Sequence, residues 1–206
     1  MAPFVPDPKR IKSFASAAAF EQWLAKHHDR WPEIWLKVHK KGSGRASVTC
    51  AEALEVALCW GWIDAIRKTF DEHSFLQRYT PRGPKSRWSQ INRDHVARLV
   101  EAGRMTPHGQ REIDKAKADG RWDAAYAPMR TATADALPAD LRAAIARNAR
   151  AEKMLATLDR TNLFSLAFRV GAMKTAEGRA KKIATLVATL ARGEPIVPKR
   201  TRTKKP

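Results

Sequence analysis

The sequence predicts an α+β protein in which a small antiparallel sheet of about three strands, flanked by helices, precedes a small all-helical C-terminal module. Apolar residues alternate with polar ones in parts of the first 130 residues and recur with a helical period in others. After a stretch rich in Ala, Thr and Pro between Trp122 and Pro138, only the helical period remains. We therefore expect an α+β domain at 1–130, a helical module at 131–195 and a disordered basic tail at 196–206.

Three strands are predicted in the first domain. Ile34 to Lys40 alternates apolar and polar side chains and ends at a loop that contains two glycines. The segments Ile63–Phe70 and Ser74–Tyr79 are separated by three residues, which is the spacing of a β-hairpin. Because Pro81 and Gly83 follow, the second hairpin strand should end there.

Helix start signals surround these strands. Ser16 can cap a helix that ends near Asp29, and Thr49 with Glu52 forms the pattern of a capping box. Ser89 can cap a third helix, and Pro107 suits the first turn of a fourth. The helical module should contain the segments 140–158, 162–173 and 175–192, the first as one or two short helices.

The charge is strongly basic, with 39 Lys and Arg against 21 Asp and Glu, a net +18. The last eight residues hold five of these bases and no acid, so the rest of the chain keeps an excess of 13. Such a chain favours anionic partners, although a basic surface also serves solubility alone. Nucleic acid is a possible partner on charge, yet no helix-turn-helix, zinc-finger or RNA-binding signature supports it.

The two cysteines, Cys50 and Cys59, lie nine residues apart in a predicted helix. That spacing corresponds to about 13 Å of helix rise, too far for a disulfide. It also matches no zinc pattern, so we expect buried thiols, no metal and no cofactor. No apolar run reaches about 20 residues and no signal peptide is evident, which predicts a cytoplasmic protein without a transmembrane segment.

Four short motifs occur in order along the first domain: KKGSG at 40–44, a helix exit ending in CWGWID at 59–64, a block from Arg78 to Asn92, and AGRMTP at 102–107. In this order and spacing they resemble the YdeI/OmpD-associated, bacteriocin-protection family. The C-terminal part resembles the small helical OmpD-associated module, most clearly in Lys174, Glu177 and 179–183. The resemblance implies a link to bacteriocin protection and to an outer-membrane protein, and it brings no catalytic residues.

One candidate ligand site emerges from two of these motifs. The hairpin should bring the tryptophans that flank Gly61 close to the loop after Tyr79, where cations accumulate without an acid. Guanidinium groups beside a helix N-terminus form an anion site, and we expect the helix capped by Ser89 to supply it. The predicted ligand-binding residues are Trp60, Trp62, Asp64, Arg78, Arg82, Lys85 and Trp88. The alternatives are a packed core corner at Trp60–Asp64, with Asp64 paired to Arg67 or Lys68, and a solvated loop in the block from Arg78 to Asn92.

An enzymatic function lacks comparable support. Asp64, Asp71, Glu72, His73 and Cys59 could carry chemistry, but they form no catalytic signature, and no phosphate-binding loop or nucleophile elbow is present. We therefore predict no catalytic residues and a non-enzymatic protein of stress or bacteriocin protection that binds an anionic ligand or partner. Non-specific nucleic-acid binding and an enzyme of unknown reaction are the alternatives.

Overall fold

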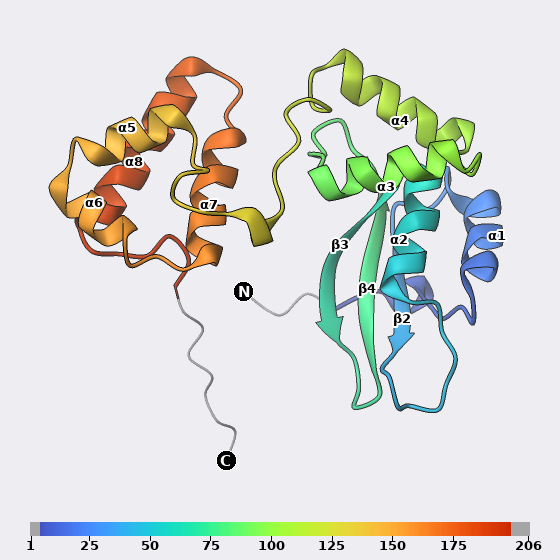
Figure 1. Ribbon diagram of the computed structural model, residues 1–206. Helices are drawn as coiled ribbons and strands as arrows, with labels where there is room; N and C mark the ends of the chain where they lie inside the picture. The colour runs from blue at the N-terminus through green and yellow to red at the C-terminus, as the bar shows by residue number, and fades with distance from the viewer. Residues whose placement is uncertain (1–4, 199–206) are drawn as a thin grey trace. The chain divides into compact units, whose positions relative to one another are not determined.

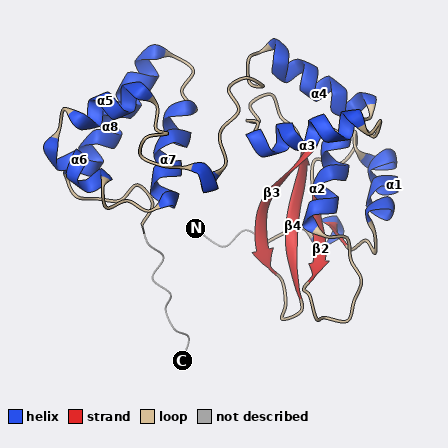
Figure 2. Cartoon of the chain, viewed as in Figure 1, coloured by secondary structure: helices blue, strands red, loops and turns tan. Residues whose placement is uncertain are grey.

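The computed structural model describes residues 5–198, which form eight α-helices and one four-stranded sheet. The chain divides into two compact units, and the boundary in the sequence lies between Ala125 and Tyr126. All strands belong to the first unit, and the second unit is helical (Figure 2). None of the helices in the described part of the chain combines the length and the apolar character needed to cross a membrane.

The sheet has the order β1-β2-β4-β3 and is mixed. The three predicted strands are present as β2 (Ile34–His39), β3 (Trp62–Thr69) and β4 (Ser74–Pro81), and their pairing is antiparallel. The expectation of about three antiparallel strands is corrected by β1 (Ile11–Lys12), which pairs parallel with β2. Two residues are too short to show a period of two, so the sequence pattern could not indicate this strand.

Two helices cover one face of this sheet (Figure 1). The first, α1 (Ala17–His27), is capped by the Ser16 hydroxyl, and the second, α2 (Cys50–Cys59), begins with the predicted capping box. Their core contains residues that are essentially inaccessible, among them Phe20, Leu24, Val56 and Tyr79. Cys50 and Cys59, the first and last residues of α2, are free thiols.

Two further helices, α3 (Gln90–Glu101) and α4 (Pro107–Ala118), pack against the C-terminal end of α2. Ser89 caps α3 and Thr106 caps α4, so both predicted starts are confirmed. The approach of α4 to α2 is very close, because a Cβ atom placed on Gly109 would lie 2.3 Å from the carbonyl oxygen of Cys59. The Thr106 hydroxyl also donates a 2.5 Å hydrogen bond to that oxygen. Only glycine fits at position 109.

The second unit consists of α5 (Ala139–Ala146), α6 (Ala149–Leu155), α7 (Arg160–Gly171) and α8 (Ala176–Ala191). Their apolar faces enclose a core of their own that includes Leu141, Leu166, Val170 and Leu190. The predicted segment 140–158 is two helices, which Asn148 separates by capping α6. Part of the predicted linker packs against this unit, because the ring of Tyr126 contacts the rings of Phe164 and Phe168 in α7.

The predicted disordered tail begins too early at residue 196. Ile196 is only 6% exposed and belongs to the core of the helical unit. The backbone N–H of Val197 donates a 2.8 Å hydrogen bond to the side-chain oxygen of Asn162. The packed part therefore extends past 195, and the remaining basic residues, 199–206, lie outside the described residues.

Replacing Gly109 with Ala should lower the free energy of unfolding. Alanine in a helix interior normally gains about 0.5–1 kcal/mol over glycine, but overpacking against a fixed backbone carbonyl costs typically 1–3 kcal/mol. Urea unfolding of Gly109→Ala should show the net loss. Gly83→Ala is the control, because its Cβ would meet nothing closer than 3.9 Å. Equal or greater stability of Gly109→Ala would contradict the packing described here.

Candidate functional site

A cavity of about 390 Å³ lies in the first unit, where the end of α1, the start of β3, the end of β4 and the first turn of α4 meet. The indoles of Trp60 and Trp62 form part of its wall. Its other lining residues, polar and charged for the most part, are His28, Asp29, Gly61, Pro81, Arg82, His108, Arg111 and Glu112. The cavity therefore combines an aromatic wall with cations and histidines.

The turn at Gly61 shapes one side of this cavity. Gly61 has φ = +73°, and an added Cβ would lie 3.0 Å from both the Glu112 side chain and the His108 carbonyl oxygen. The backbone N–H of Arg82 donates to the Gly61 carbonyl oxygen over 2.9 Å. This bond holds the end of β4 next to the start of β3, as the hairpin predicted.

Three of the seven predicted site residues line the cavity: Trp60, Trp62 and Arg82. Arg82 is only 6% exposed, and its guanidinium lies 3.5 Å from the centre of the Trp88 ring. Trp88 is thus a buried support behind Arg82 instead of a lining residue. In the Trp60–Asp64 corner, Trp62 is 1% exposed and donates to the His28 carbonyl oxygen, as the packed-corner interpretation expects, whereas Trp60 and Arg82 line the cavity.

The other three predicted residues lie elsewhere. Asp64 and Lys85 are exposed and do not line the cavity. Arg78 alternates with Tyr79 along β4, so it lies on the opposite face of the sheet from the core that contains Tyr79. The prediction of one concavity lined by all seven residues is wrong for these positions: Glu33 holds Arg78 on the other face of the sheet, Arg82 follows the end of β4 at Pro81, and Asp64 and Lys85 lie outside the lining.

Arg78 has an internal partner that the sequence did not reveal. Its Nε and Nη2 both lie 2.6 Å from Oε2 of Glu33, which is 7% exposed. The other Glu33 oxygen accepts a 3.3 Å hydrogen bond from the Trp35 indole and lies 3.4 Å from Arg10. Two charged contacts to one oxygen of a buried carboxylate give Arg78 a structural role.

The helix N-terminus at the cavity is that of α4 and not that of α3. Sequence reasoning placed Ser89 there, yet the lining residues His108 and Arg111 come from the first turns of α4. The signal for α4 was present in Thr106 and Pro107. Its position against the Trp60 corner follows from the contact between Gly109 and Cys59, which is a tertiary contact that no local pattern encodes.

The histidines and Arg111 form one hydrogen-bonded group. Nδ1 of His108 lies 2.9 Å from Nε2 of His28 and 2.5 Å from Nη2 of Arg111. A guanidinium only donates hydrogen bonds, so this contact requires an unprotonated Nδ1 on His108. Nδ1 of His28 lies 3.1 Å from the carbonyl oxygen of Leu24 and must donate to it. His28 thus links Leu24 of α1 to His108 in the first turn of α4.

The surroundings of His108 also favour its neutral form. Partial burial lowers the pKa of His108, and the nearby His28 and Arg111 charges lower that pKa further. The Trp60 indole stacks on the His108 ring with 5.4 Å between centroids and 15° between planes. The lowered pKa favours the neutral form of His108, and Arg82 and Arg111 supply positive charge in the cavity wall.

The carboxylates of the cavity wall are paired with cations that do not line it. Glu112 accepts a 2.7 Å bond from Lys115, and Asp29 lies 3.9 Å from Arg30. Within residues 5–198, no carboxylate lies within ion-pair distance of Arg111. In the same described part of the chain, no group of three metal-ligating side chains is present. The arrangement suits an anion better than a cation.

The fold and cavity define a protein of two units, an α+β unit with a small polar and aromatic cavity and a separate four-helix unit. Residues 136–193 match the family described as "Bacteriocin-protection, YdeI or OmpD-Associated", so the helical unit is a domain of this family. Residues 12–112 match a domain of unknown function, DUF8412. The four motifs at 40–107, which resembled the YdeI/OmpD-associated family, lie within the DUF8412 match. Comparison with curated proteins and with solved structures gave no match.

The lowered pKa of His108 should make the stability of the first unit depend on pH. The unfolded chain takes up a proton as the pH falls through the ordinary histidine value of 6.5, while the folded chain resists it. The free energy of unfolding should therefore decrease as the pH is lowered from about 7.5 to the lowered pKa of His108. Thermal unfolding of His108→Gln should show a smaller loss over that range than the wild type. The exposed turn variant His73→Gln should behave like the wild type, and a larger loss for His108→Gln would contradict the assignment.

Replacing Glu33 with Gln should destabilise the first unit. The change keeps the shape of the side chain but removes the charge that holds Arg78 and Arg10, and such charged hydrogen bonds contribute about 1.5–3 kcal/mol. Urea unfolding at neutral pH measures the effect. Glu72→Gln, at an exposed turn, is the matched control and should stay within about 0.5 kcal/mol of the wild type. If both variants unfold alike, the network around Glu33 is not stabilising.

Proposed function

We propose that the N-terminal unit binds a small ligand with a phosphate or carboxylate group in the cavity between Trp60 and α4. The observation that supports this most strongly is Arg111, a cation in the cavity wall with no carboxylate partner within residues 5–198. Arg82 adds a second guanidinium, held in place by its stack on Trp88. The Trp60 indole would contact an apolar part of the ligand.

The chemistry proposed here is binding without turnover. The cavity brings together cations, two histidines and indoles, but it contains no nucleophile paired with a base. Cys59 is buried, and burial raises its pKa to about 11, so its thiolate is not accessible as a nucleophile at neutral pH. The biological setting is protection against bacteriocins or a related stress, which is the role named by the family that the helical unit matches.

Binding should depend on Arg111 more than on any distant cation. A hydrogen bond to a charged group contributes about 1.5–3 kcal/mol, so Arg111→Gln should weaken binding of inorganic phosphate, pyrophosphate or succinate by roughly 10- to 150-fold. Isothermal titration calorimetry at low salt measures the affinities. Arg111 is exposed, so its replacement should leave the fold intact, whereas Arg82→Ala would also remove a buried stack.

Lys41→Gln is the control, because it removes the same charge from an exposed loop after β2. It should bind each anion as the wild type does. Equal weakening in both variants would mean that the anions respond to net charge alone. A short DNA duplex in the same titration tests the alternative partner: binding of the duplex that both variants weaken equally, with no binding of the small anions, would replace this proposal by non-specific nucleic-acid binding.

A further inference from the structure

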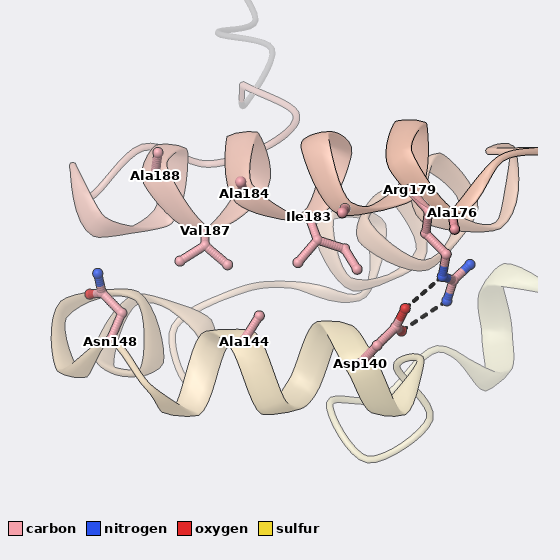
Figure 3. A pocket seen from close by; sticks show the side chains of 10 residues that line it. Asp140, Ala144, Asn148, Ala176, Arg179, Ile183, Ala184, Val187 and Ala188 are labelled. Carbon is pink, nitrogen blue, oxygen red and sulfur yellow. Dashed lines mark hydrogen bonds and ion pairs between the residues drawn. The ribbon is translucent and has the colours of Figure 1, made fainter.

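The helical unit contains a second hollow, unrelated to the proposed anion site. A groove of about 640 Å³ runs between α5 and α8. Figure 3 shows the two helices side by side, with the side chains of Ile183 and Val187 from α8 and Ala144 from α5 directed into the space between them. One end is closed by the ion pair of Asp140 with Arg179, whose closest atoms are 2.6 Å apart, and Asn148 lies at the other end.

The floor and walls of this groove are apolar. From α8 come Ile183, Val187 and four alanines, Ala176, Ala180, Ala184 and Ala188, and the alanines are exposed. They follow one another at intervals of four residues, so they form a single stripe along the helix. Ala144 of α5 faces them (Figure 3).

The stripe is not required by the core of the unit. Leu186 and Leu190 bury the other apolar side of α8, where the core of the four helices lies. Small side chains on the groove side would let another helix approach closely, within the 8–10 Å usual between packed helix axes. An amphipathic helix that lies in a groove presents apolar anchors at intervals of three and four residues, and this spacing matches the stripe.

The charges around the groove indicate which kind of helix could bind there. Arg147 is exposed beside the row formed by Ala144 and Asn148, whereas Lys181, near Ala184, is paired with Glu177. The acids on α5 and α8, Asp140 and Glu177, are each paired with a cation at 2.6 Å. Within residues 5–198, no carboxylate lies within ion-pair distance of Arg142, Arg147 or Lys182. A second copy of the chain would bring the same excess of cations and a net charge of +18.

We propose that the α5–α8 groove binds an amphipathic helix of another protein, with apolar residues that enter the groove and carboxylates that flank them. The apolar stripe supplies the contact area, and Arg147, which has no carboxylate within ion-pair distance in residues 5–198, supplies the complementary charge. This binding is separate from the anion cavity and does not depend on it.

The test uses the full-length chain and three synthetic helical peptides of sixteen residues, the length of α8. The first peptide has a Leu and Ala seam flanked by Glu, the second has Lys in place of Glu, and the third has the composition of the first with the apolar residues scattered. Fluorescence anisotropy of labelled peptides measures binding. Only the first should bind, with an affinity that falls as salt is added.

Two variants of the protein locate the binding. Ala184→Glu places a charge in the middle of the groove and should weaken binding by about tenfold or more, because that charge would be desolvated. Thr185→Glu adds the same charge one residue away, at an exposed position outside the groove lining, and should change binding less than about twofold. Both positions are exposed, and matching thermal unfolding of the two variants with the wild type confirms intact folding.

Three results would overturn the proposal. Equal binding of the scattered peptide would show attraction by charge alone. Binding of the first peptide that Ala184→Glu leaves unchanged would place it outside the groove. Concentration-dependent self-association that Ala184→Glu abolishes, seen by analytical ultracentrifugation without peptide, would make a second copy the occupant.

Discussion

The contact between Gly109 of α4 and the carbonyl oxygen of Cys59 is the constraint on which the candidate site depends. The start of α4 can approach the end of α2 this closely only because position 109 has no Cβ atom. The Thr106 hydroxyl fixes the same carbonyl oxygen, so the first turn of α4 is held at the Trp60–Gly61 corner. Without this approach His108 and Arg111 would not face Trp60, and the cavity would lose two of its polar groups.

The excess of basic residues is distributed among different physical roles. Arg78 is held by the buried carboxylate of Glu33, and Arg82 is stacked on a buried indole. Arg78 is therefore part of the packing, whereas Arg82, although stacked, also lines the cavity. Arg111 in the cavity and Arg147 beside the α5–α8 groove carry the two binding proposals, because they lie at hollows and no carboxylate within residues 5–198 lies within ion-pair distance of them.

The two units present different kinds of surface for binding. The cavity of the α+β unit is small, polar and lined in part by aromatic rings, which suits a compact charged ligand. The groove of the helical unit is larger, apolar and bordered by cations, which suits an acidic helix. The helical unit carries the family match, and the α+β unit matches a domain of unknown function, so the proposed activities fall on parts with separate family relationships.

The sequence by itself determined the α+β class, the three main strands and the helix starts at Ser16, Thr49, Ser89 and Pro107, because periods, caps and first-turn prolines are local properties of the chain. It also brought Trp60, Trp62 and Arg82 together, since a tight hairpin fixes which residues are opposite. The tertiary structure decided the rest of the site. Glu33 pairs with Arg78 away from the cavity, and the helix that begins at the cavity is α4 instead of α3. His28 and His108, which are 80 residues apart in sequence, are in contact there. Those outcomes depend on the packing of helices over long sequence distances, and no single-segment pattern records such packing.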